Sequence, residues 1–311
     1  MARSTYLVTG GAGFIGSHLC EALMLRGHAV RVLDDLSTGR YENLPLGAEL
    51  IGGDVADPAK VERAIDGVDG CFHLAAIASV ARGVEDWLGT HRTNLTGTIT
   101  LFDVVRRMRP GVPVVYASSA AVYGDCPTMP IAETAEKRPL SAYGADKYGC
   151  ELHALVASHV HQVPTVGLRF FNVYGSRQDP RSPYSGVISI FCERLRRGAA
   201  VEVFGDGEQT RDFIHVGDVV TALLAAMALR PAGAPVFNVC TGIATSVLAL
   251  AHTIAALSGN RATIRHAPPR AGEIRHSVGS PDRARAALDL GPPVALRDGL
   301  QNVLDWYSTA D

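Results

Sequence analysis

The chain has 311 residues, of which 47% are hydrophobic and 19% are charged. This length and composition predict one large α/β domain with an added lobe, and they exclude intrinsic disorder. The formal net charge of -2 gives no basic surface for nucleic acid or an anionic membrane, so we expect a small-molecule partner.

The cysteines and the N-terminal residues bear on the compartment. The six cysteines are scattered, with no CxxC pair and no Cys/His spacing of a zinc site, so we expect free thiols and no bound metal. The first residues lead almost directly into an apolar run, without the charged and apolar regions of a secretory signal. The apolar stretch 221–229 is too short to cross a bilayer and ends at Arg230-Pro231. Together they predict a cytoplasmic protein without a membrane segment.

Short apolar runs separated by helix-length segments recur through roughly the first 170 residues. They predict buried strands at 6–9, 28–33, 70–73, 112–117 and 165–170. Because buried strands that alternate with helices form parallel sheets, we predict a Rossmann-like, doubly wound α/β fold.

The pattern changes after Asn172, to loops rich in Gly, Pro, Arg and Asp around 174–186. They precede a predicted helix over 187–197 and short strands near Val201 and Phe213. A helix over 218–229 and a strand over 236–240 should return to the main sheet. We therefore predict a dinucleotide-binding domain of residues 1–174 plus about 210–260, and a smaller, discontinuous α/β substrate lobe of about 175–209 plus 261–311.

Gly10, Gly13 and Gly16 stand where the first predicted strand meets a helix. Glycines at this spacing let the backbone turn tightly and approach a pyrophosphate, which then lies at the positive end of the helix. Asp34 ends the second predicted strand, where a carboxylate accepts hydrogen bonds from an adenosine ribose and repels a 2′-phosphate. These features favour NAD over NADP, although Arg31 and Arg40 leave NADP open.

Two further polar residues follow predicted strands. Asp54 lies past a further strand, third along the chain, that should end before Gly53, and it could meet the adenine amine or equally begin a turn. His73 ends another strand, and we interpret it as a structural residue rather than a catalytic one.

A phenol and an ammonium lie one helical turn apart at Tyr143 and Lys147, so they share a helix face. Ser119 follows the buried run 112–117, at the edge where open α/β sheets collect their ligands. The three side chains could therefore meet at one site.

The motifs TGGAGFIG, SSAAVYG, YGADK, LRFFNVYG and QTRDFIHVGD, in this order, resemble those of the extended short-chain dehydrogenase/reductase family. Within it the chain looks like the UDP-hexose 4-epimerases, including the UDP-N-acetylglucosamine 4-epimerases, over nearly its whole length. The resemblance implies that Ser119, Tyr143 and Lys147 form the catalytic triad. Oxidation of a secondary alcohol needs a base, and a free tyrosine with pKa about 10 is a poor one at neutral pH. Lys147 and the positive nicotinamide would stabilise the phenolate, while Ser119 would orient or relay the proton.

The positions after Ser119 separate the reactions of this family. Related 4,6-dehydratases carry an Asp-Glu pair there for the elimination of water, and related decarboxylases keep a Glu at the second place. Here the two places hold Ala120 and Ala121. Reversible epimerisation needs neither acid, so the alanines favour it.

The resemblance also implies the cofactor contacts. The loop 73–79 should pass beneath the nicotinamide, and Ala78 replaces the Lys or Gln of some members. The residues expected to contact NAD are Gly10, Gly13, Phe14, Ile15, Gly16, Asp34, Asp35, Ser37, Thr38, Gly39, Asp54, Val55, Leu74, Ala75, Ala76, Ala78, Asn94, Tyr143, Lys147 and Phe170.

For the substrate, the resemblance assigns Asn172, Arg211 and Arg270 to the UDP phosphates and Glu273 to the uridine ribose. The remaining expected contacts are Ser79, Ser119 and Tyr143 for the sugar, and Val187, Ile188, Val203 and Phe204 for the base. GDP and dTDP sugars stay open.

Ser277 matches a gate residue beside the sugar C2 substituent, where a tyrosine confines relatives to plain hexoses. A small gate should admit an N-acetyl group. We expect UDP-N-acetylglucosamine/N-acetylgalactosamine interconversion with some activity on UDP-glucose/galactose. The narrower alternative is an epimerase of plain hexoses alone.

Two other interpretations of this fold are weighed against the epimerase. One is a non-catalytic NAD-sensing or scaffold protein, and the other is a sugar-nucleotide reductase or 3,5-epimerase, which often uses NADPH. Such scaffold relatives commonly lose the tyrosine or lysine that this chain retains. The family resemblance further implies a homodimer formed through helices around 95–105 and 150–160.

Overall fold

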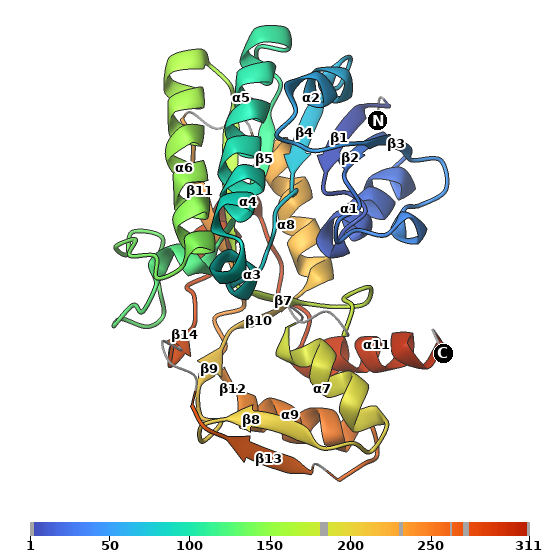
Figure 1. Cartoon of the computed structure of the whole chain (residues 1–311), viewed down its shortest axis with the longest axis vertical. Coiled ribbons are helices and arrows are strands. Elements are labelled where there is room, and N and C mark those ends of the chain that lie inside the picture. Colours follow the sequence, from blue (N-terminus) through green and yellow to red (C-terminus); the bar gives the residue numbers. More distant parts are fainter. Residues whose placement is uncertain (1–2, 181–185, 230–232, 262, 270–273, 310–311) are drawn as a thin grey trace.

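A seven-stranded parallel sheet forms the upper part of the molecule (Figure 1). The computed structural model describes residues 3–180, 186–229, 233–261, 263–269 and 274–309. The strands are β1 (Thr5–Thr9), β2 (Ala29–Asp34), β3 (Glu49–Gly52), β4 (Gly70–His73), β5 (Val114–Ser119), β6 (Thr165–Phe170) and β11 (Val236–Val239). Their order is β11-β6-β5-β4-β1-β2-β3, and each neighbouring pair is parallel. The order reverses between β1 and β4, which places the expected ligand crevice at the carboxyl ends of these strands.

Helices cover both faces of this sheet. On one face α1 (Phe14–Leu25), α8 (Val216–Ala228) and α10 (Asp282–Leu288) share a hydrophobic core with the strands. On the other face α2 (Pro58–Ile65), α5 (Gly97–Met108) and α6 (Ala142–His161) enclose a second core. The Rossmann-like fold predicted from the sequence is confirmed.

Local signals explain where some of these helices begin. Asp57 caps α2 by accepting a hydrogen bond from the Ala59 amide, and Pro58 occupies the first turn. Ser141 caps α6 in the same way through the Gly144 amide, at 3.0 Å. The cap fixes the first turn of α6, which carries Tyr143.

Short helical segments connect the strands near their carboxyl ends. They are η1 (Tyr41–Asn43), α3 (Val80–Glu85), α4 (Trp87–His91), the π-helix η2 (Arg92–Thr96) and η3 (Ala120–Tyr123).

The lower part of Figure 1 has its own hydrophobic core. It contains α7 (Val187–Arg196), β8 (Val201–Phe204), α9 (Val247–Leu257), β13 (Ile264–Ala267) and α11 (Leu296–Thr309). Between the two parts lie β7 (Asn172–Tyr174), paired with β10 (Phe213–His215), and the small sheet of β12 (Thr245–Ser246), β9 (Thr210–Arg211) and β14 (His276–Ser277). The chain therefore enters the lower part several times.

The packing differs from the expected boundaries of the two parts at α9 and α10. We placed residues up to about 260 with the main sheet, but α9 packs on α7 and α11 in the lower core. We placed everything after 261 in the lobe, but Ala284 and Leu288 of α10 pack against the main sheet. The apolar residues of α9 and α10 show that each helix packs on a core, but not which of the two cores it joins.

The structure bears on two further expectations. Each of the six cysteines, all within the described residues, is a free thiol. None of the described helices combines the length and apolarity that crossing a bilayer requires.

Candidate active site

The glycine-rich turn after β1 is shaped for close backbone approach. Gly10 has a φ of +70°, and a Cβ there would come within 2.7 Å of the Ala75 amide nitrogen. A Cβ on Gly16 would collide with the Gly10 carbonyl oxygen. Gly13 precedes the first residue of α1, Phe14, and offers no side-chain cap, so free amides of the helix end face the turn. This cradle fits the pyrophosphate of a dinucleotide.

Asp34 ties this turn to the loop after β2. Its buried carboxylate accepts hydrogen bonds from the amides of Ala12, at 2.9 Å, and Leu36, at 2.8 Å. Burial raises the pKa of Asp34, and these two hydrogen bonds oppose the rise. Each carboxylate oxygen has a second acceptor site, so the group can still meet a ribose.

The loop that follows contains the expected contacts Asp35, Ser37, Thr38 and Gly39. Asp35 accepts hydrogen bonds from the amide of Ser37, at 2.9 Å, and from its hydroxyl, at 2.6 Å. Gly39 lies against Ala12 of the glycine-rich turn, where a Cβ would crowd the Ala12 methyl. The loop therefore borders the cradle.

The two arginines that left NADP open are engaged elsewhere. Arg31 pairs with Glu49 at 2.8 Å and donates to backbone carbonyls of Ala64 and Asp66. Arg40 pairs with Asp179. Neither guanidinium stands ready for a 2′-phosphate.

Asp54 turns the chain and contacts η2. It accepts a hydrogen bond from the Ala56 amide at 2.8 Å and pairs with Arg92 at 2.9 Å. Its neighbour Val55 is buried against Gly97. The turn-forming interpretation of Asp54 is thus observed, and its contact with adenine stays a prediction.

The loop 74–79 is held by two buried side chains. The Thr9 hydroxyl accepts hydrogen bonds from the amides of Leu74 and Ala75, both at 3.2 Å. Asn94 lies in the π-helix η2, where its carboxamide accepts from the Ile77 amide at 2.8 Å and donates to the Ile77 carbonyl at 3.2 Å. Because both polar atoms of Asn94 are used on Ile77, its observed role is to shape the loop. Thr9 was missed, although it is the first residue of the TGGAGFIG motif.

The remaining expected contacts of this region flank the same loop. Ser79 caps α3 by accepting a hydrogen bond from the Arg82 amide at 3.0 Å. Phe170 ends β6 as the register partner of Ser119. Ile15 follows Phe14 in α1, and Ala76 and Ala78 lie in the loop itself.

His73 is buried with both ring nitrogens hydrogen-bonded, to the Thr9 hydroxyl at 2.8 Å and the Thr98 hydroxyl at 2.9 Å. Thr98 donates its own proton to the Asn94 carbonyl, so it accepts from Nε2 and leaves Nδ1 as an acceptor. Burial, with a contribution from Lys147, lowers the pKa of His73 to about 3. A neutral ring fixed on both sides agrees with a structural role.

Ser119, Tyr143 and Lys147 come from two adjacent elements. Ser119 is the last residue of β5, and its hydroxyl accepts a hydrogen bond from the Ala121 amide at 3.2 Å. Tyr143 lies in the first turn of α6, and the Lys147 ammonium is 5.9 Å from the centre of its ring. Lys147 is buried and donates to the Ala117 carbonyl at 3.0 Å. The base, its cation and the hydroxyl thus lie beside the carboxyl edge of the sheet.

On the substrate side, Arg211 and Ser277 are register partners in β9 and β14. Asn172 begins β7, and its amide donates to the Asp212 carbonyl at 3.0 Å. Val187 begins α7, and Phe204 ends β8, each half-buried. Arg270 and Glu273 lie outside the described residues.

Ile188 and Val203 do not fit their expected role. Both side chains are buried in the core of the lower part. Side chains alternate between buried and exposed along β8, and Val203 is on the buried side. Ile188 lies on the buried face of α7. Neither side chain therefore has exposed surface with which to contact a base.

Asp212 was missed although it joins the expected substrate residues. Its amide donates to the Ser277 carbonyl at 3.0 Å. Its carboxylate accepts from the Thr241 amide and hydroxyl, the Gly242 amide and, at 3.3 Å, the Gly279 amide. The side chain is fully buried, which raises the pKa of Asp212 against these hydrogen bonds.

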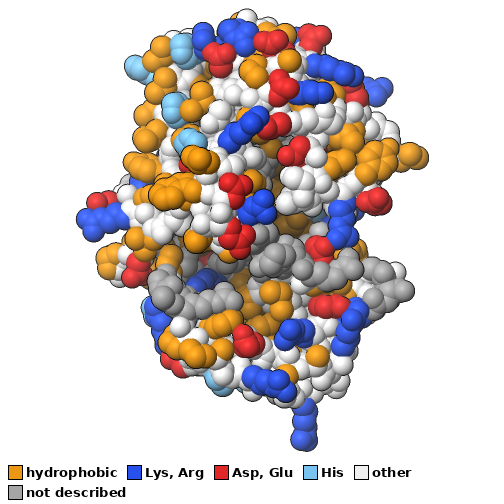
Figure 2. Space-filling view, viewed as in Figure 1, with side chains coloured by type: hydrophobic (Ala, Val, Ile, Leu, Met, Phe, Trp, Pro, Cys, Tyr) orange, Lys and Arg blue, Asp and Glu red, His pale blue; other side chains and the backbone are white. Residues whose placement is uncertain are grey.

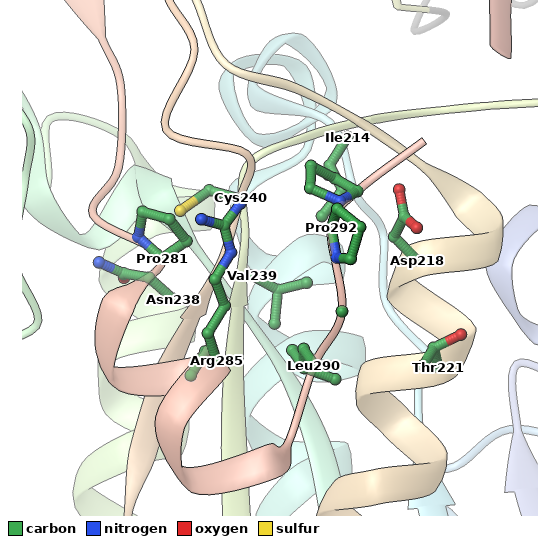
Figure 3. Close-up of a pocket in the computed structure, with 13 residues that line it drawn as sticks. Ile214, Asp218, Thr221, Asn238, Val239, Cys240, Pro281, Arg285, Leu290 and Pro292 are labelled. Atoms are coloured by element: carbon green, nitrogen blue, oxygen red, sulfur yellow. The ribbon is translucent and has the colours of Figure 1, made fainter. Parts of the chain in front are cut away.

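A cavity of about 210 Å³ opens elsewhere, between β11, α8 and α10 (Figure 3). Asn238, Cys240, Asp218 and Arg285 line it, and none of the expected site residues does. The residues expected to be catalytic lie at the carboxyl edge of the sheet, so we do not assign the active site to this cavity.

The sequence model of the NAD dependent epimerase/dehydratase family matches residues 6–240. The chain belongs to this family, and its cofactor is NAD. It is 37% identical to a UDP-glucose 4-epimerase of Mycolicibacterium smegmatis, over 97% of both chains.

Two solved structures share the fold closely. A UDP-glucose 4-epimerase from Thermotoga maritima with UDP-glucose matches with a TM-score of 0.94 and 36% identity, over 98% of this chain and 99% of that one. A UDP-N-acetylglucosamine 4-epimerase from Methanobrevibacter ruminantium, in complex with UDP-N-acetylmuramic acid, matches with a TM-score of 0.94 and 32% identity over the whole of both chains.

Proposed function

We propose that the chain is an NAD-dependent 4-epimerase of UDP-hexoses. The observation that carries the proposal is that Lys147, near the Tyr143 ring on α6, donates a hydrogen bond to the Ala117 carbonyl of β5, the strand that ends at Ser119. Alanines occupy the two places that follow Ser119. Removing the proton of a secondary alcohol needs the Tyr143 base and no acidic residue at positions 120 and 121.

In this reaction Tyr143 takes the proton of the sugar C4 hydroxyl. The buried Lys147 favours the phenolate that does so, and Ser119 orients the hydroxyl. The glycine-rich turn and Asp34 would hold NAD, which would supply a reversible hydride acceptor for the sugar C4. Inversion follows because the 4-keto sugar, tethered by its UDP, turns to present its other face before reduction.

The UDP-sugar relatives support this substrate class, and Ser277 favours the acetylated pair. A serine beside the sugar C2 substituent leaves room for an N-acetyl group, so UDP-N-acetylglucosamine and UDP-N-acetylgalactosamine are the preferred substrates. Plain UDP-glucose and UDP-galactose are the second candidate, because the relative from Mycolicibacterium smegmatis and the Thermotoga maritima structure carry the name UDP-glucose 4-epimerase.

The deciding experiment incubates purified protein with each UDP-sugar in turn and separates the epimers. Interconversion without added cofactor supports the proposal, whereas net consumption of NADPH would favour a reductase. GDP- and dTDP-sugars serve as nucleotide controls. No turnover of any nucleotide sugar, with NAD bound, would favour the non-catalytic interpretation.

We further propose a homodimer formed through α5 and α6. Apolar side chains are exposed along α6, which lies at the upper left in Figure 2. They are Leu152, Leu155, Val156 and Val160, with Ile99 and Met108 on α5. We call these exposed side chains on two neighbouring helices the apolar stripe, and they fit a second copy of the same surface. The free cysteines fit the proposed cytoplasmic location.

A further inference from the structure

A buried ion pair lies directly behind the catalytic edge. Glu151 on α6 receives two hydrogen bonds from Arg169 on β6, from Nε at 2.8 Å and from Nη2 at 2.7 Å. Both side chains are more than nine-tenths buried. Ser118, the residue before Ser119, donates its hydroxyl proton to the same carboxylate at 2.5 Å. Every polar atom of the Glu151 carboxylate therefore has a partner.

The pair belongs to a longer buried network. Arg169 Nη1 donates to the Tyr123 hydroxyl at 2.7 Å, which in turn donates to Asn238 at 2.6 Å. Burial raises the pKa of Tyr123 to about 12, so this phenol keeps its proton. The Glu133 carboxylate also accepts a hydrogen bond from the backbone amide of Asn238, at 2.9 Å. A fully satisfied network of this kind holds its members in one arrangement.

Two hydrogen bonds join the end of β5 to α6. Lys147 reaches the Ala117 carbonyl, and Glu151, one helical turn further, receives the Ser118 hydroxyl. These contacts hold two successive residues of β5, Ala117 and Ser118, and Ser119 is the next residue along the strand. The separation between Ser119 and Tyr143 is thereby set by where α6 is fastened to β5.

We propose that Glu151 is a positioning residue that fastens α6 to the strand end and so places Ser119 and Tyr143 for proton transfer. The inference rests on the proposed epimerase function. Arg169 is the buried cation that pairs with this carboxylate. Although burial disfavours the charge of Arg169, its hydrogen bonds and ion pair with Glu151 outweigh that cost and raise its pKa.

The charge of this pair also bears on Lys147. The charge of Lys147 acts on His73 from β4 and on Cys150 from α6, and Asp146 and Glu151 of α6 act on the same Cys150. The Tyr143 ring is the other titratable neighbour of the ammonium. Removing the Glu151 charge leaves the buried Arg169 cation without its carboxylate partner. A net gain of positive charge favours the phenolate form of the base and moves the acidic limb of the pH profile to lower pH.

Two variants test the proposal. Ser118→Ala removes only the hydrogen bond from the Ser118 hydroxyl to the Glu151 carboxylate. Glu151→Gln removes the negative charge and one acceptor oxygen. We expect each to lower kcat by about 10-fold with KM for the UDP-sugar nearly unchanged, because a displaced base costs rate rather than binding. Only Glu151→Gln should shift the acidic limb of the kcat profile. Ser118→Thr, which keeps the hydroxyl, should recover most of the rate.

The matched control is Val61→Ala in α2, a buried truncation distant from the site. It should lower the melting temperature without changing kcat. If Glu151→Gln does not fold, Ser118→Ala and Ser118→Thr carry the test alone. Wild-type kcat in Ser118→Ala would overturn the positioning role, as would an equal loss in Ser118→Thr. A wild-type chain that epimerises no UDP-sugar would overturn the proposed function instead.

Discussion

Ser277 and Arg211 are direct neighbours across the parallel pairing of β14 and β9. In a UDP-hexose the phosphate is attached to C1, and C2 is the adjacent carbon. A residue expected at the diphosphate and a residue expected at the C2 substituent should therefore be neighbours. The pairing register of β14 and β9 therefore agrees with the gate role that we propose for Ser277.

Ser277→Tyr should selectively slow the acetylated substrates. The added ring would fill the space of the N-acetyl group, and we expect kcat/KM to fall about 10-fold or more for UDP-N-acetylgalactosamine. Turnover of UDP-galactose should change little. Epimer formation from both substrates measures the ratio, with Ser277→Ala as the control that keeps the gate small. An equal loss on both substrates would show that Ser277 is no gate.

Asp212→Asn should weaken substrate binding while leaving the chemistry intact. The new amide would face the N–H groups of Gly242 and Gly279, so donors would oppose donors around Arg211 and Ser277. We expect KM for the UDP-sugar to rise about 10-fold with kcat and NAD content unchanged. Titration calorimetry with UDP gives the same shift directly. Thr241→Val, which removes one hydrogen bond to the same carboxylate, should have a smaller effect.

The contacts of Asp212 and Glu151 could not be predicted from the sequence. The parallel strands, the glycine turn and the spacing of Tyr143 and Lys147 follow local patterns, and all were predicted. The partners of Asp212 lie 29 to 67 residues away, and Ser118 lies 33 residues from Glu151. Such contacts form only when segments distant in the sequence pack together, so no periodicity of the sequence predicts them.

The small sheet was beyond prediction for a different reason. Strands β9, β12 and β14 contain two residues each, too few for alternation to appear. The inward direction of Val203 likewise depends on which side of β8 the lower core forms. A family resemblance supplied these residues as contacts, and packing decides which of them are exposed.

His73 predicts a stability that falls with acid. Its folded pKa of about 3 is below the ordinary value of 6.5, so the unfolded chain binds the proton first. The contribution of His73 to the free energy of unfolding is fully present above pH 6.5. It declines as the pH falls from 6.5 toward 3, by about 1.4 kcal/mol per pH unit. Urea unfolding at several pH values measures the slope. His73→Gln should flatten it, whereas His159→Gln, at an exposed position, should not. An unchanged slope in His73→Gln would contradict the buried neutral ring.

Val156→Glu should separate the proposed dimer. A charge in the middle of the apolar stripe on α6 would be buried without a partner in the interface. Light scattering after size exclusion should give the monomer mass of 32.9 kDa for the variant and twice that mass for the wild type. Leu25→Glu, an exposed apolar position on α1, is the control and should stay dimeric. A wild type of monomer mass would rule out the dimer.

Tyr143→Phe should remove most of the activity without disturbing either ligand. The phenol is the group that we propose takes the C4 proton, so we expect kcat to fall about 100-fold or more. The ring itself is retained, and NAD and UDP binding should stay at wild-type levels when measured by cofactor content and calorimetry. Tyr148→Phe on the same helix is the matched control and should keep its rate. Unchanged turnover in Tyr143→Phe would remove the base from the mechanism, and the reaction would then require another acceptor for the C4 proton.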